Sequence, residues 1–282
     1  MTAAINLFNK IFSLMLSLLL MATGGVNTLF NGDIKEYDSV DGVVGLESLV
    51  RAQGITTDGE SFIYSGKNAL ERVSLDGGEV LAINTSAIEE SFETEYGSKH
   101  IGGISCAGGK LYCAIEDSKV WQHPIIAVYD PVTLEFTGEY YELPTELHQR
   151  GVPFVIADSE NGVAYTMDSR NYTEIFVWSL DNFEYLRTIS LANEIKAAQG
   201  GEYYNGLIYF GTNDMTRAVY TVNPETGETN KLFDRIMYEY TLIDNFGGEG
   251  EDLTILPAED GTYIHTLQIG ATFTDATTRH YS

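Results

Sequence analysis

A strand–turn–strand unit recurs five times along this chain, at intervals of about fifty residues. Each copy has a short strand, a turn rich in Gly, Asp or Asn, and a second strand rich in Tyr and branched residues. The copies begin at 53–59, 103–109, 154–162, 201–206 and 253–261. A period of this length is typical of propellers and solenoids rather than of one continuous sheet.

Each of the first four copies adds a third strand, and this strand ends in a turn that contains Asp or Pro. These outer turns fall at 130–133, 180–183 and 223–227. The fifth copy offers strands only over 253–256, 263–269 and 271–273. A strand over 33–39 is available to supply the missing outer strand and so to remove an exposed sheet edge. We therefore predict an all-β, five-bladed β-propeller closed by an N-terminal strand. The alternative is a six-bladed propeller in which 33–49 helps to build a further blade.

Two stretches between the strands have no strand pattern. The acidic segment 86–99 shows no sustained period and predicts a loop. Residues 191–198 predict one or two helical turns. We expect no other helix after the N-terminal segment.

The N-terminus has the pattern of a secretory signal peptide. Lys10 precedes an apolar run over 11–21, and small residues follow at 22–25. The run is short for a bilayer span, although an uncleaved anchor is the alternative. We expect a signal peptide over 1–24 and a single propeller domain over 25–282. The mature protein is then secreted, extracellular or in the cell envelope, and does not insert into a membrane.

The chain is strongly acidic, with 41 acidic and 16 basic residues and a formal net charge of −25. Nucleic-acid binding requires clustered Lys and Arg, which are missing here. A solvated acidic surface explains this balance, and so does a site for Ca²⁺ or for a cationic ligand. We expect a monomer whose partner is a small polar molecule, a peptide or a glycan.

The two cysteines, Cys106 and Cys113, flank the Gly108-Gly109 pair. If these glycines form a two-residue hairpin loop, Cys106 faces Leu111 and Cys113 faces Ile104. The cysteines then lie diagonally on one face. Buried thiols are the expectation, and a disulfide is the alternative in an exported protein.

Candidate site residues lie just before the first strand of each copy. In a propeller these strands line the central channel, and ligands favour its mouth. The residues expected to bind a ligand there are Gln53, His100, Arg150, Gln199 and Glu249. The alternative is that they bind only backbone groups or ordered water.

Glu249, Glu251 and Asp252 form the densest acidic group at this rim, within a Gly-rich segment. Oxygen ligands on a flexible loop suit Ca²⁺, and we expect no other cofactor. Their spacing differs from that of an EF-hand, and a solvated acidic loop is the alternative. No nucleophile elbow, P-loop or zinc signature is found, so catalytic residues are unknown.

Residues 52–86 resemble the opening blade of glutaminyl cyclotransferases of the plant and bacterial type. The similarity consists of Gln53-Gly54, Gly59, Ile63-Tyr64, the Leu70–Val73 stretch and the turn at 76–78. Segments 128–136 and 222–229 are similar as well. The resemblance implies an exported five-bladed propeller whose relatives convert an N-terminal Gln to pyroglutamate.

The chain departs from this family where the reaction needs a carboxylate. The family's second blade opens with a Glu-Gly pair, and this chain has Gly102-Gly103 there. Without that Glu the general acid and base for cyclisation is missing. We therefore expect a non-catalytic binding propeller. The alternatives are a divergent glutaminyl-peptide cyclotransferase and a metal-dependent, lactonase-like hydrolase that uses Glu249, Glu251 and Asp252.

Overall fold

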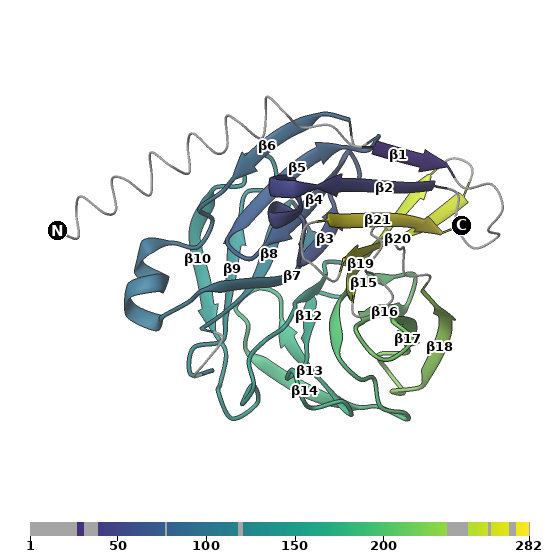
Figure 1. Cartoon of the computed structure of the whole chain (residues 1–282). Helices are drawn as coiled ribbons and strands as arrows, with labels where there is room; N and C mark the ends of the chain where they lie inside the picture. The colour runs from purple at the N-terminus through teal and green to yellow at the C-terminus, as the bar shows by residue number, and fades with distance from the viewer. Residues whose placement is uncertain are drawn as a thin grey trace.

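The protein forms five small antiparallel sheets around a central axis, a five-bladed β-propeller (Figure 1). The computed structural model describes residues 27–30, 39–76, 78–117, 121–235, 248–258, 261–270 and 275–281. The predicted fold class is confirmed, and the six-bladed alternative is wrong. The predicted signal peptide lies outside the described residues.

The first two blades each contain four strands. Blade 1 contains β3 (Gly54–Thr57), β4 (Ser61–Gly66), β5 (Ala69–Ser74) and β6 (Val80–Asn84). Blade 2 contains β7 (His100–Ala107), β8 (Lys110–Glu116), β9 (Ile125–Tyr129) and β10 (Phe136–Glu142). The first strand of each blade is the innermost one, and β3 and β7 contact each other near the axis.

Blades 3 and 4 repeat this order. Blade 3 contains β11 (Ile156–Asp158), β12 (Val163–Thr166), β13 (Glu174–Ser179) and β14 (Tyr185–Ser190). Blade 4 contains β15 (Ala198–Tyr204), β16 (Leu207–Thr212), β17 (Ala218–Val222) and β18 (Thr229–Asp234).

Blade 5 joins the two ends of the chain. It is a five-stranded sheet in the order β1 (Asn27–Phe30), β2 (Ser39–Val44), β21 (Asp275–Tyr281), β20 (Gly261–Ile269) and β19 (Glu249–Ala258). Strand β2 pairs antiparallel with β21 along its whole length, and Figure 1 shows the two side by side. Closure by an N-terminal strand is therefore confirmed. The closing strand begins at Ser39, whereas most of the predicted strand over 33–39 lies outside the described residues, as does the predicted strand over 271–273.

Two local predictions are wrong. No helix forms over 191–198, because this segment gives its backbone N–H groups to neighbouring segments: Leu191 donates to Thr173 and Ile195 donates to Tyr172. The expected loop over 86–99 contains a short π-helix, η2 (Phe92–Tyr96), which buries Phe92. A 3-10 helix, η1 (Gly45–Val50), also follows β2. None of the helices in the described ranges is long and apolar enough to cross a membrane.

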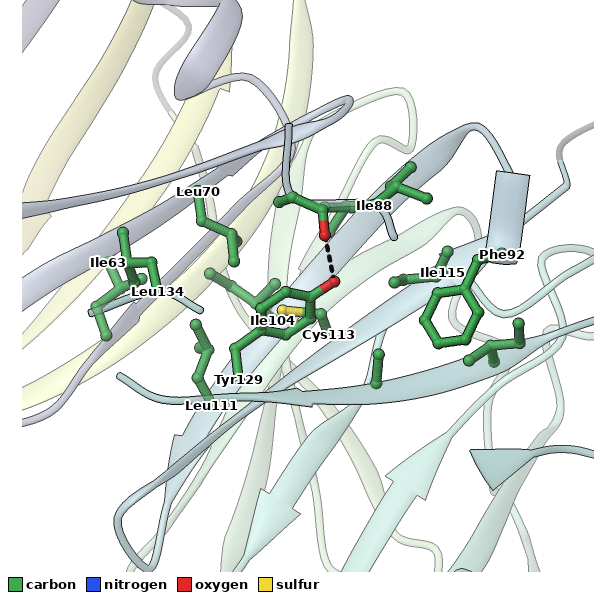
Figure 2. Close-up of a cluster of buried hydrophobic side chains, with 14 residues drawn as sticks. Ile63, Leu70, Ile88, Phe92, Ile104, Leu111, Cys113, Ile115, Tyr129 and Leu134 are labelled. Atoms are coloured by element: carbon green, nitrogen blue, oxygen red, sulfur yellow. Dashed lines mark hydrogen bonds between the residues drawn. The ribbon is translucent and has the colours of Figure 1, made fainter. Parts of the chain in front are cut away.

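Hydrophobic clusters fill the spaces between successive blades, so the core is a ring of interfaces rather than one centre. The cluster between blades 1 and 2 is drawn in Figure 2, where Leu70 of blade 1 faces Ile104 and Leu111 of blade 2. Tyr129 is fully buried there, and its hydroxyl donates a 2.7 Å hydrogen bond to the carbonyl of Ala87. The alternating apolar faces of the strands thus bind each blade to the next.

The cysteines occupy the predicted register. Cys106 pairs with Leu111 and Cys113 with Ile104, and both thiols are free. Cys113 is fully buried in the cluster of Figure 2, whereas Cys106 is half-buried. Burial raises the pKa of Cys106 to about 12, so neither geometry nor ionisation favours a reactive thiolate.

Candidate functional site

A cavity of about 160 Å³ lies at the mouth of the channel, the end at which the innermost strands begin. We call it the mouth cavity. Its lining comprises Gln53, His100, Gly102, Gly103, Glu116, Pro153, Ser169, Ala197, Ala198 and Gln199. The structure thus brings together three of the five predicted ligand-binding residues, Gln53, His100 and Gln199. It adds Glu116, which the sequence analysis did not select.

A β-bulge in β7 places Glu116 beside His100. The register of β7 and β8 shifts between Ile101 and Ile104, so His100 pairs with Glu116. The two glycines inside the bulge permit close packing across the axis. A Cβ on Gly102 would fall 2.1 Å from the carbonyl oxygen of Pro153, and one on Gly103 would fall 2.6 Å from Cβ of Phe154. The Gly102-Gly103 pair therefore shapes the mouth and positions a carboxylate there.

Hydrogen bonds fix the orientation of the imidazole in the mouth cavity. The amide nitrogen of Gln53 donates to the carbonyl of Ala52, so its Oε1 is left as an acceptor. His100 Nε2 lies 2.6 Å from this Oε1 and is therefore assigned as the donor. His100 Nδ1 lies 3.4 Å from Glu116 Oε1. The ring thus donates to an amide on one side and lies beside a carboxylate on the other, without a hydrogen bond between Nδ1 and that carboxylate.

Two polar atoms in this cavity lack a hydrogen-bond partner among the described residues. They are His100 Nδ1 and Glu116 Oε2, both buried. A neutral imidazole whose Nε2 donates has an acceptor at Nδ1. A carboxylate oxygen is an acceptor as well. Buried polar atoms are rarely left unsatisfied in proteins, so this pair of acceptors calls for a bound donor.

Arg150 is separated from these residues. It lines a second cavity of about 550 Å³ on blade 3, which we call the blade 3 cavity. Its guanidinium carbon lies 5.6 Å above the ring of Trp121. The separation arises at Gly151, whose backbone has a φ of +90°, and a Cβ there would fall 1.8 Å from Glu116 Oε2. Gly151 therefore packs on the carboxylate of the mouth cavity while Arg150 points to the neighbouring one.

Glu249 lies at the start of β19, next to Glu251. Glu251 is buried, and burial together with the Glu249 carboxyl, to which it is hydrogen-bonded, raises its pKa well above the usual range. The buried guanidinium of Arg235 lies close by and donates a 3.0 Å hydrogen bond to the carbonyl of Glu251. Neither glutamate lines the mouth cavity.

Asp252 lies where the innermost strands of four blades meet. Its Oδ2 accepts hydrogen bonds from the backbone N–H groups of Ile55, at 3.3 Å, and Ile104, at 3.2 Å. Its Oδ1 accepts a bond of 2.8 Å from Leu253. A Cβ on Gly200 would fall 2.0 Å from this oxygen, so only glycine fits opposite it. Burial raises the pKa of Asp252 well above its ordinary value despite the three donors.

This geometry bears on the predicted acidic group. The oxygens of Asp252 are engaged by backbone donors, and Glu249 and Glu251 bind each other. Across the ranges that the structure describes, no group of three or more His, Cys, Asp and Glu side chains is arranged to hold a metal ion. The three residues thus lie close in sequence without forming a ligand set.

Comparisons with known proteins assign no family to this chain. No family model matches the chain, and no curated protein matches it. Among solved structures, a match is hydrazine synthase of Kuenenia stuttgartiensis, with 13% identity and a TM-score of 0.43. The alignment covers 78% of this chain and 56% of that one. At that level of similarity it carries no argument, and the propeller assignment rests on the strand pairing described above.

Proposed function

We propose that this protein is a binding propeller that holds the amino terminus of a peptide in the mouth cavity. The observation that carries the proposal is the pair of buried acceptors, His100 Nδ1 and Glu116 Oε2, which belong to two residues that line one small cavity. A peptide ammonium offers three donors and a positive charge, which suit a carboxylate and an imidazole. The amides of Gln53 and Gln199 lie at the same cavity and suit the first peptide group.

Size and charge support this choice of ligand. A cavity of about 160 Å³ admits a group of roughly the size of a single six-membered ring, not a whole oligosaccharide. The formal charge of −25 favours the approach of cations. Export through a signal peptide remains a prediction, and it is consistent with a partner outside the cell.

The test uses fluorescent pentapeptides with a free or an acetylated amino terminus. The free form should bind at least about tenfold more tightly, because a charge-assisted hydrogen bond contributes about 1.5–3 kcal/mol. Glu116→Gln should remove this preference. Glu139→Gln is the matched control, because it removes the same charge from β10 of the same blade without reaching the cavity. Equal affinity for free and acetylated peptides would refute the proposal, and binding to a glycan array instead would favour the glycan alternative.

A second candidate is a divergent glutaminyl-peptide cyclotransferase, and Glu116 is the observation that favours it. Blade 1 resembles the opening blade of that family, but the chain has Gly102-Gly103 in blade 2 where the family has its carboxylate. Glu116 supplies a carboxylate at the same cavity from the neighbouring strand. In such a reaction the terminal amine attacks the side-chain amide carbon of Gln. A C–N bond forms to close the ring, the amide C–N bond breaks, and ammonia leaves with a proton from the amine.

Mass spectrometry separates the two candidates. Prolonged incubation with peptides that begin with Gln should show loss of ammonia if the enzyme candidate is right, and Glu116→Gln should abolish it. Binding without loss of ammonia supports the binding propeller.

A further inference from the structure

The blade 3 cavity contains two arginines, Arg150 and Arg170, whose guanidinium groups are not neutralised by any acid among the described residues. Its lining comprises Glu146, Leu147, Gln149, Arg150, Asp168, Arg170, Asn171, Glu174, Phe176 and Thr188. Both Arg150 and Arg170 are exposed. Within the described ranges, neither guanidinium group makes an ion pair or a hydrogen bond, and that of Arg150 rests on Trp121.

The other arginines of the chain are all engaged. Arg51 pairs with Glu71, Arg72 with Asp58 and Arg187 with Glu225. The guanidinium groups of Arg217 and Arg235 donate hydrogen bonds to backbone carbonyls, and Arg279 also has interactions within the protein. In a chain with 41 acidic and 16 basic residues, two unpaired arginines at one cavity stand apart.

A single carboxylate positions both arginines without neutralising them. Asp168 Oδ2 accepts a 2.6 Å hydrogen bond from the backbone N–H of Arg150, and Oδ1 accepts one of 2.9 Å from that of Arg170. Glu174 accepts a hydrogen bond from the amide of Asn171. Two of the three acids that line the cavity are therefore engaged by other groups, and the third, Glu146, forms no ion pair with either arginine among the described residues. The two guanidinium groups thus keep their donors for another anion.

The blade 3 cavity adjoins the mouth cavity. Ser169 lines the mouth cavity, and its two chain neighbours, Asp168 and Arg170, line the blade 3 cavity. On the other wall, Gly151 packs against Glu116 while Arg150 lines the blade 3 cavity. Adjacent Cα atoms are about 3.8 Å apart, so an extended ligand of a few residues spans both cavities.

We infer that the blade 3 cavity binds the carboxylate of an acidic side chain in the same peptide, a few residues after its amino terminus. This assignment rests on the proposed function of the mouth cavity. The planar forks of Arg150 and Arg170 match a carboxylate, which can bind each of them bidentately. The buried face of Phe176 and the half-buried Leu147 offer apolar contact for the methylene groups of Glu. The ligand class is thus a peptide with a free amino terminus and a nearby acidic residue.

The experiment measures affinities for short peptides that carry a single Glu at the second, third or fourth position and a free amino terminus. Each has a counterpart with Gln in that position, and all are amidated at the carboxyl end. At the best position the Glu peptide should bind about tenfold more tightly than its counterpart. The double variant Arg150→Gln, Arg170→Gln should erase this ratio while changing the affinity for the Gln peptide less than twofold. Arg150→Lys, Arg170→Lys should retain only part of it, because lysine lacks the fork.

Arg187→Gln is the matched control. It removes one positive charge from β14 of the same blade, where the guanidinium pairs with Glu225 outside the cavity, and it should leave the ratio unchanged. A ratio near one at every position, or a ratio that survives in the double glutamine variant, would overturn this assignment alone. No binding of any peptide would overturn the proposed function together with it.

Discussion

The mouth cavity and the blade 3 cavity share a wall, yet their chemistry is opposite. The mouth cavity is small and is lined by His100 and Glu116, each of which has a buried acceptor atom without a hydrogen-bond partner among the described residues. The blade 3 cavity is wider and presents the donors of Arg150 and Arg170. The contrast shows that strands and loops contribute differently: a bulged strand buries acceptors near the axis, whereas a loop held by Asp168 leaves donors open to solvent.

The largest expected effect is a loss of stability in acid, and it arises from His148 on the blade 3 side of the comparison. This buried histidine packs on the ring of Phe176, which lines the blade 3 cavity, and its Nε2 lies 3.0 Å from Thr166 Oγ1. Burial lowers its pKa from 6.5 to about 3. The unfolded chain binds a proton below pH 6.5 and the folded chain does not. Stability is therefore lost as the pH falls through this window, and the loss levels off near pH 3.

Between pH 7 and pH 4 the expected loss is about 3 kcal/mol. Urea unfolding at both pH values measures it. His148→Gln keeps a polar group for Thr166 but does not titrate, so its free energy of unfolding should fall less over the same interval. An identical pH dependence in the variant would show that His148 is not the group responsible.

Gly151 tests the wall between the cavities. Gly151→Ala places a Cβ on Glu116 Oε2 at a positive φ, whereas Gly162→Ala imposes a positive φ of +67° with nothing within 4 Å. We expect Gly162→Ala to cost about 1 kcal/mol and Gly151→Ala about 3 kcal/mol. Thermal unfolding of the two variants gives the difference, which is the cost of displacing the Glu116 carboxylate and the Trp121 ring, because a Cβ on Gly151 would also fall 2.7 Å from Cδ1 of Trp121. Equal losses would mean that both side chains move aside freely.

Asp168→Asn tests the loop with a smaller effect. The variant keeps one acceptor oxygen for two backbone donors, so we expect it to lose about 1.5 kcal/mol of stability. The preference for an acidic peptide should also decrease, because the two arginines are no longer held together, while discrimination against acetylated peptides should persist. Asp130→Asn is the control, because that carboxylate binds backbone N–H groups in the outer turn of blade 2. Loss of both preferences would show that the cavities are not independent.

The architecture was predictable because it depends on local signals. Turn residues mark the ends of the strands in each blade, and the Gly108-Gly109 loop sets the register that pairs Cys106 with Leu111. The closing strand was harder to place, since β2 is a short segment whose identity depends on pairing with β21 at the other end of the chain. Local patterns contain no information on such a partner.

The candidate site was predictable only in part. Gln53, His100 and Gln199 share a cavity because each precedes or begins an innermost strand. Glu116 was missed because an unbulged hairpin places residue 117, not 116, opposite His100. The adjacent glycines at 102–103 were the available signal for a bulge. Arg150 lines the blade 3 cavity rather than the mouth cavity, and the sequence does not reveal this because it depends on the turn at Gly151.

The pairing of β2 with β21 has a consequence for biosynthesis. The ribosome releases β2 long before its partner β21, with an interval on the order of ten seconds or more between them. Throughout that time the nascent chain carries an unsatisfied strand edge on each side of the growing ring. A holdase chaperone that covers β2 until β21 has been synthesised would protect the unfinished propeller from aggregation.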